Sequence, residues 1–185
     1  SYEEKQLGVD NAFDGVRIKI SPYRGIQLKA LAGYQRYYWE KGPGIVKGVD
    51  GDFLINEMIP SLVEKPWQIS VGGSFVSKYQ ADDDPIYALP KNVGAGAGRM
   101  QFSLAGFNLM AEYAYKANDP SSDNGLIYRP GQAFLVNASY SRSGLGILLS
   151  TKWVDNMSFR SNRNALATDL NINQLPEITR NHTYS

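Results

Sequence analysis

Among the residues whose side chains could bind a ligand or catalyse a reaction, the charged residues are the most regularly spaced, because they alternate with apolar ones. If the apolar positions of each predicted strand lie on one face of a sheet, the charged positions share the other face. The excess of basic over acidic residues on this charged face predicts a pore wall that favours anions or polyhydroxylated solutes, unless the charges pair with one another. Ten residues are expected on it, seven basic and three acidic: Arg17, Lys19, Lys29, Asp50, Asp52, Lys78, Arg99, Glu112, Lys116 and Lys152.

Other reactive patterns have weaker support. The chain has one histidine, His182, in a polar segment, whereas the hydrolases of membrane surfaces need a histidine beside a serine or a carboxylate. Residues 94–98 alternate Gly and Ala, but they lack the Lys-Ser/Thr and the helix of a phosphate-binding loop. The run Asp82-Asp83-Asp84 lacks the spacing of a calcium loop. We therefore predict no enzyme, no metal and no cofactor.

The elements that must position the charged residues are β-strands. Residues 132–153 form two runs that alternate with period two, joined by a turn at 141–144, and this pattern predicts a hairpin. Similar runs predict strands at 15–20, 26–39, 45–56, 67–79, 92–103 and 107–116, with a loop at 40–44 and a β-bulge near Gly98 and Arg99. The predicted fold is all-β, an antiparallel up-and-down meander of about eight long strands.

Strand length and aromatic placement indicate that this meander is part of a transmembrane β-barrel. Strands of soluble sandwiches average about five or six residues, whereas barrel strands need about nine to eleven. Aromatic residues near the strand ends are typical of the two membrane interfaces. The alternatives are a soluble β-sandwich and a β-solenoid. Nine residues are expected in the aromatic girdle: Tyr34, Tyr38, Trp39, Trp67, Tyr79, Tyr113, Tyr115, Tyr140 and Trp153.

The connections support the same reading and define one domain over residues 1–185. They are short after the first, fifth and seventh predicted strands and longer after the second, fourth, sixth and eighth, as in barrels with short periplasmic turns. We expect a polar piece at 1–14, hairpins at 15–153 and a long polar loop at 154–181. The chain shows neither a signal peptide nor an aromatic-terminated last strand, so we expect an internal part of a longer barrel.

Composition excludes several classes of function. The net charge of +1 gives no electrostatic case for nucleic-acid binding. Without cysteine there are no disulfides and no thiolate metal sites. The longest apolar run, at 145–149, is far shorter than the ~20 residues of a spanning helix.

Four segments carry a resemblance: residues 8–11, 33–39, 47–51 and 73–79, which read GVDN, GYQRYYW, KGVDG and GSFVSKY. The chain resembles a family of uncharacterised outer-membrane β-barrels of Bacteroidetes-type bacteria. The resemblance implies a barrel in the outer membrane. The partners that we expect there are the lipid bilayer, lipopolysaccharide and other outer-membrane or envelope proteins. The resemblance implies no activity and no catalytic residue. The expected function is a porin-like channel or uptake barrel for small polar or anionic solutes. The alternatives are a non-conducting structural or assembly partner and, third, a surface enzyme.

Overall fold

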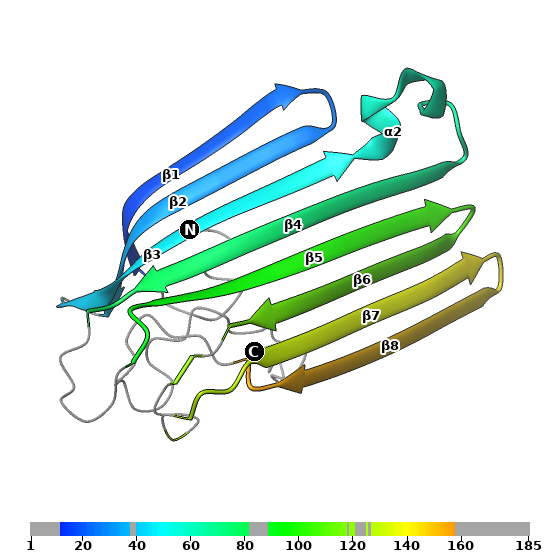
Figure 1. Ribbon diagram of the computed structural model, residues 1–185. Coiled ribbons are helices and arrows are strands. Elements are labelled where there is room, and N and C mark those ends of the chain that lie inside the picture. The colour runs from blue at the N-terminus through cyan, green and yellow to red at the C-terminus, as the bar shows by residue number, and fades with distance from the viewer. Residues whose placement is uncertain are drawn as a thin grey trace, which may run out of the picture.

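Eight strands form one antiparallel sheet in which each strand pairs with the next along the chain (Figure 1). The computed structural model describes residues 12–37, 40–81, 89–117, 119–120, 125 and 127–157. The predicted antiparallel meander is confirmed. Within the described residues β1 and β8 do not pair with each other, so the sheet is open. The strands are β1 (Ala12–Tyr23), β2 (Ile26–Tyr37), β3 (Glu40–Leu54), β4 (Trp67–Tyr79), β5 (Asn92–Leu104), β6 (Phe107–Lys116), β7 (Gly131–Arg142) and β8 (Leu145–Asp155).

The strands divide their side chains between two faces. Residues paired across neighbouring strands share a face, and side chains alternate along each strand. Lys29, Asp50 and Ser74 are aligned across β2, β3 and β4, and all three line a cavity, so we call this side the concave face. The opposite side is the outer face, where Val49 and Phe75 are 56% and 52% exposed.

The two ends of the sheet differ in their connections. At one end, the turn end, residues 24–25, 105–106 and 143–144 join successive strands. Gly106 has a φ of +86°, and a Cβ there would meet the carbonyl oxygen of Ser141, so glycine is required at this turn. At the other end, the loop end, the connections after β4 and β6 are longer. This asymmetry was predicted, with one exception at β2–β3.

That exception is the segment at 40–44, which was predicted to be a loop. The structure places it in β3, which begins at Glu40, so only residues 38–39 separate β2 from β3. The register shifts between Tyr34 and Arg36, which pair with Ile45 and Lys41. Pro43 lies within this irregularity, where its missing N–H interrupts no regular ladder. The Gly-Pro-Gly sequence therefore marks a bulged strand rather than a loop.

A second correction concerns the bulge predicted near Gly98 and Arg99. The β4–β5 register runs without a shift from Trp67 opposite Leu104 to Tyr79 opposite Asn92. The glycines of β5 lie on the outer face, and a Cβ at Gly94 would stand 2.9 Å from the ring of Phe75. The ring of Phe75 thus covers Gly94, and the outer face there is apolar without any change of register.

The β3–β4 connection contains a short helix, α2 (Ile55–Met58), and a 3-10 turn, η1 (Pro60–Leu62). Asn56 fixes the β3–β4 connection to the sheet by three hydrogen bonds. Its amide nitrogen donates to the carbonyl oxygens of Leu62 and Trp67 at 3.0 and 2.7 Å, and its Oδ1 accepts from the backbone N–H of Ile69 at 2.8 Å. In the part of the chain that the structure describes, no helix is long and apolar enough to cross a membrane.

The interior is small and partly polar. Among the described residues, the buried hydrophobic side chains are Val46, Leu89 and Val93. Lys78 and Lys116 are buried with them on the concave side of the loop end. Most large hydrophobic side chains are instead exposed, many of them on the outer face. The described strands form one sheet, so within this part of the chain no second sheet covers the apolar surface as in a sandwich.

Candidate functional site

The concave face carries all ten charged residues predicted to share one side of the sheet. Their positions follow from the register: Lys19 pairs with Lys29, Lys29 with Asp50, and Arg99 with both Gly72 and Glu112. The remaining residues lie an even number of positions from these along the same strands or pair with a concave residue. Their role as the lining of a pore stays a prediction.

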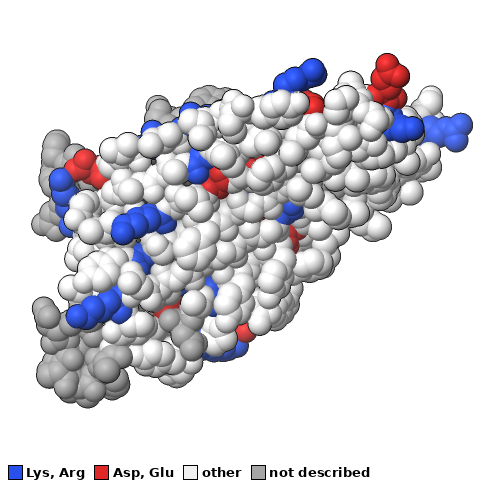
Figure 2. Space-filling view, turned by 45° about the horizontal axis from the view of Figure 1, so that its top comes forward, with Lys and Arg blue, Asp and Glu red and all other residues white. Residues whose placement is uncertain are grey.

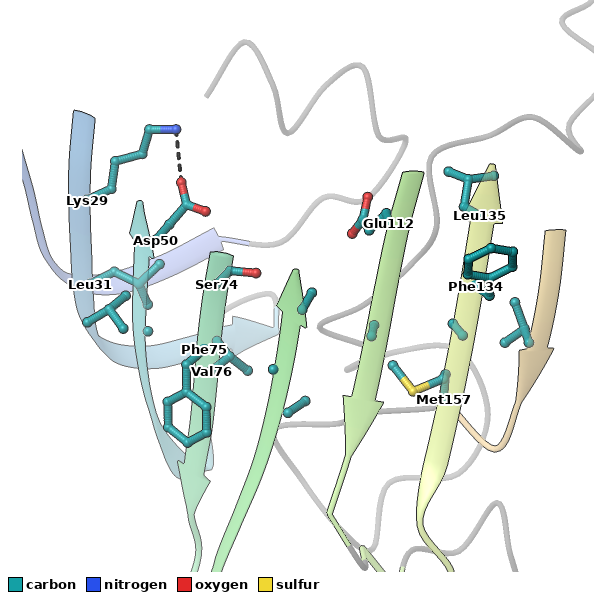
Figure 3. Close-up of a pocket in the computed structure, with 18 of the residues that line it drawn as sticks. Lys29, Leu31, Asp50, Ser74, Phe75, Val76, Glu112, Phe134, Leu135 and Met157 are labelled. Carbon is teal, nitrogen blue, oxygen red and sulfur yellow. Dashed lines mark hydrogen bonds and ion pairs between the residues drawn. The ribbon is translucent and has the colours of Figure 1, made fainter. Parts of the chain in front are cut away.

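Four of the ten form one ion-paired cluster, composed of Lys29, Arg99, Asp50 and Asp52. The Lys29 Nζ lies 3.2 Å from Asp50 and 3.5 Å from Asp52, and Figure 3 shows the first contact at one side of the pocket. Arg99 Nη2 lies 2.6 Å from Asp50 and 2.5 Å from Asp52. Two cations and two carboxylates cancel in formal charge, so this cluster adds nothing to the cationic bias of the face.

Gly72 makes the cluster possible. Arg99 is on β5 and Asp52 is on β3, and β4 lies between them with Gly72 opposite both residues. A Cβ at Gly72 would stand 2.6 Å from Arg99 Nε and 2.8 Å from Asp52 Oδ1. The arginine therefore crosses a whole strand in the space that the missing side chain leaves. Sequence reasoning missed this contact because it joins strands that are not neighbours.

A second ion pair is buried at the loop end. Lys78 Nζ lies 3.1 Å from Asp119 Oδ2, and the two side chains are 1% and 0% exposed. Asp119 comes from the β6–β7 connection and was not predicted to take part in any site. Pro120 and the β6 residue Lys116 are also fully buried. The β6–β7 connection therefore covers part of the charged wall at this end.

Lys19 has no ion pair and no side-chain hydrogen bond among the contacts of the described chain, and the same is true of Glu112 and Lys152. The Glu112 and Lys152 side chains line the same cavity. Leu135 separates them, since it pairs with Glu112 on β6 and with Lys152 on β8. Unlike the cluster at β2–β5, these two opposite charges are not used in holding the sheet together.

The cavity has a volume of about 650 Å³ and spans the concave face from β1 to β8. Its floor is not uniformly polar. Ala97, Ala114, Ala133 and Val154 are aligned across β5–β8, and we call this row the apolar strip. Figure 3 shows Glu112 and Leu135 on the side of the pocket opposite Lys29. The strip was not predicted, although its alanines share the parity of the charged residues.

The predicted aromatic girdle falls on the outer face wherever its members are described. The residues near the turn end are Trp67, where β4 begins, and Tyr140, close to the end of β7. Those on the loop-end half are Tyr34, Tyr79, Tyr113, Tyr115 and Trp153. Tyr38 and Trp39 lie outside the described residues. The role of all these residues as an aromatic girdle at membrane interfaces stays a prediction.

The remaining candidates cannot be located. The run Asp82-Asp83-Asp84 and His182 lie outside the described residues, and so do the segments 1–11 and 158–185. Within the residues that are described, no group of three or more His, Cys, Asp or Glu side chains is arranged to hold a metal ion.

Comparison with known proteins gives one match. Residues 1–185 match a family of unknown function, DUF6029. No curated protein and no solved structure matches the chain significantly.

Proposed function

We propose that this chain, which belongs to the DUF6029 family of unknown function, forms the wall of a β-barrel in the bacterial outer membrane that passes small polar or anionic solutes. The observation that carries the proposal is the apolar outer face. Val49, Phe75 and Leu149 are 56%, 52% and 67% exposed there. A sheet that leaves so many large apolar side chains uncovered needs an apolar surrounding, which the bilayer and the acyl chains of lipopolysaccharide provide.

The positions of the charged residues on the outer face leave an uncharged band between its two ends, and such a band supports the proposal that the sheet crosses a membrane. Asp14, Lys41 and Lys47 lie toward the loop end of this face, where the Lys41 and Asp14 side chains form an ion pair. Arg142 lies at the turn end. Between them the outward positions of the described strands carry no charge. Figure 2 shows a broad surface of mostly uncharged residues, with charged side chains at both ends and a few between them.

Strand length supports the same band. β4 has 13 residues. At roughly 3.3 Å per residue and a tilt of about 45°, a strand of this length crosses about 30 Å, which is close to the hydrocarbon thickness of a bilayer. The unpaired edges of β1 and β8 would pair with further strands in the assembled barrel, because a membrane-spanning sheet must satisfy every backbone polar group.

A non-conducting structural or assembly barrel is the second candidate. The burial of Lys78, Lys116, Asp119 and Pro120 favours it, since the β6–β7 connection covers wall residues at the loop end. The balanced cluster of Lys29, Arg99, Asp50 and Asp52 also favours it, because these charges hold the sheet rather than face a solute. The two candidates share the membrane wall and differ only in whether the lumen conducts.

Single-channel recording of the reconstituted protein in a planar bilayer separates the two candidates. We expect stepwise conductance and a reversal potential under a salt gradient that indicates anion preference. Cation preference would refute the solute preference but not the channel. Conductance no higher than that of the bare bilayer would refute the channel and leave the structural role.

A further inference from the structure

The apolar strip gives the concave cavity a floor that a purely polar channel does not need. Ala97, Ala114, Ala133 and Val154 are cross-strand neighbours on four consecutive strands. Leu135 and Met157 line the same cavity beside them. Aligned side chains on neighbouring strands lie about 5 Å apart, so the strip is a continuous apolar surface. Its small side chains leave room above the sheet for the body of a ligand.

The charges beside the strip differ in whether they are already paired. Lys29 and Asp50 line the cavity, but each is engaged in the four-residue cluster. Glu112 is half-buried and Lys152 is exposed, and neither has a partner within the described chain. They are two strands apart, which puts their backbones roughly 10 Å from each other. The cavity therefore presents one unpaired anion and one unpaired cation across an apolar floor.

From this arrangement we infer that the cavity binds a zwitterionic ligand with an apolar body, its cationic group toward Glu112 and its anionic group toward Lys152. The inference rests on the proposed transport function and names its substrate class. A volume of about 650 Å³ lies within the ~300–1,000 Å³ of small-ligand sites. An extended tripeptide spans about 10 Å, so its free amino and carboxyl ends match the separation of the two charges. Tri-leucine is thus a suitable water-soluble probe.

A simple anion explains the cavity less well. Glu112 lies on β6, between the charge-balanced cluster at β2–β5 and Lys152 at β8, and it would repel an anion placed near the strip. A purely apolar ligand would leave Glu112 and Lys152 without a compensating charge inside the site. A zwitterion can form an ion pair with each of them.

Cysteine protection tests the inference, because the chain contains no cysteine. Ala114→Cys places a thiol in the apolar strip, and Ser139→Cys places one on the concave face outside the cavity lining. Each full-length variant is reconstituted in lipid nanodiscs and treated with a charged, water-soluble maleimide at increasing concentrations of tri-leucine. We expect the peptide to slow modification of Ala114→Cys about tenfold at ten times its dissociation constant, by mass action. Modification of Ser139→Cys should not change.

Blocked peptides then test the two charges separately in the Ala114→Cys background. N-acetylation of tri-leucine should weaken binding about two- to fivefold, as expected for an exposed ion pair, and should have no further effect on the Glu112→Gln variant. C-terminal amidation should behave in the same way with Lys152→Gln. Equal protection by the blocked and free peptides would overturn the assignment of the charges.

The controls separate this inference from the proposed function. If both cysteines react and tri-leucine protects neither, the ligand assignment is wrong and the membrane wall stands. If it protects both equally, binding is not specific to the cavity and the assignment is also wrong. If neither cysteine reacts with the aqueous reagent, the concave face does not meet water, and the transport function fails together with the inference.

Discussion

Arg99 on β5 reaches across β4 to donate to Asp52 on β3, from Nε at 3.0 Å and from Nη2 at 2.5 Å. Gly72 lies between them and has no side chain to block the path. The contact joins β3 and β5 through side chains, across the strand that lies between them. Both partners are about one-third exposed, so each retains contact with solvent.

Filling the space at Gly72 should therefore loosen the cluster. Gly72→Val would press a branched side chain against Arg99 and Asp52, and we expect a loss of about 1–3 kcal/mol in the free energy of unfolding. Urea titration of the protein in lipid measures it. Gly98→Val on the outer face is the matched control, since a Cβ there meets nothing within 4 Å. Equal losses in both variants would show that strand propensity, not the cluster, sets the cost.

Removing Arg99 should change the charge of the wall. Arg99→Gln leaves Asp50 and Asp52 with Lys29 as their remaining cation in the cluster. We expect the reversal potential under a salt gradient to move toward cation preference, because the concave face gains one net negative charge. In the double variant Arg99→Gln/Asp52→Asn the shift should be largely reversed. An unchanged potential in the single variant would place the cluster away from the ion path.

The buried pair of Lys78 and Asp119 should control the β6–β7 connection. Lys78→Met removes the cation that lies 3.1 Å from the buried Asp119 carboxylate, and we expect destabilisation of about 3–5 kcal/mol by urea titration. Lys78→Met/Asp119→Leu should recover part of this loss, since both charges of the pair are removed while Lys116 stays buried in either variant. If the connection narrows the lumen, conductance in the stable double variant should rise. Conductance identical to wild type would mean that the pair holds the fold without narrowing the path.

Charges placed on the two faces should have unequal effects. Phe134→Arg and Leu149→Arg put a cation on the outer face against lipid, at a cost of roughly 2–4 kcal/mol. Asn137→Arg and Ser150→Arg point to the concave face and should be tolerated if that face meets water, apart from the loss of the hydrogen bond between these two residues at 2.5 Å. Folding yield and urea midpoints in lipid provide the comparison. Similar losses in both sets would contradict a water-lined wall.

Much of the fold could be predicted because the alternation of apolar and polar residues with period two indicates which face of the sheet each residue occupies. Gly25 and Gly106, both with positive φ, mark tight turns that the sequence makes plain. Residues 40–44 were misread because Gly and Pro serve a bulged strand as well as a loop. The bulge near Gly98 was wrongly predicted because the apolar residues of β5 change parity along the sequence, and only the structure shows the ring of Phe75 over Gly94.

The candidate site was less predictable than the fold. Parity assigned Lys29, Asp50, Asp52 and Arg99 to one face, but it could not show that Arg99 spans a strand to reach its partners. The pairing of Lys78 with Asp119 depends on where a connection folds, and no local pattern specifies that. The apolar strip required the register of four strands, which fixes Ala97 beside Ala114 and Ala114 beside Ala133.

Labelling of single cysteines along β4 tests the membrane wall most directly. In the reconstituted protein, a charged maleimide should modify Ser70→Cys and Ser74→Cys on the concave face. It should leave Val71→Cys and Phe75→Cys unmodified, because the outer face lies in lipid. Reaction that alternates with period two is the predicted result. Equal reaction at all four positions would contradict a membrane-spanning sheet.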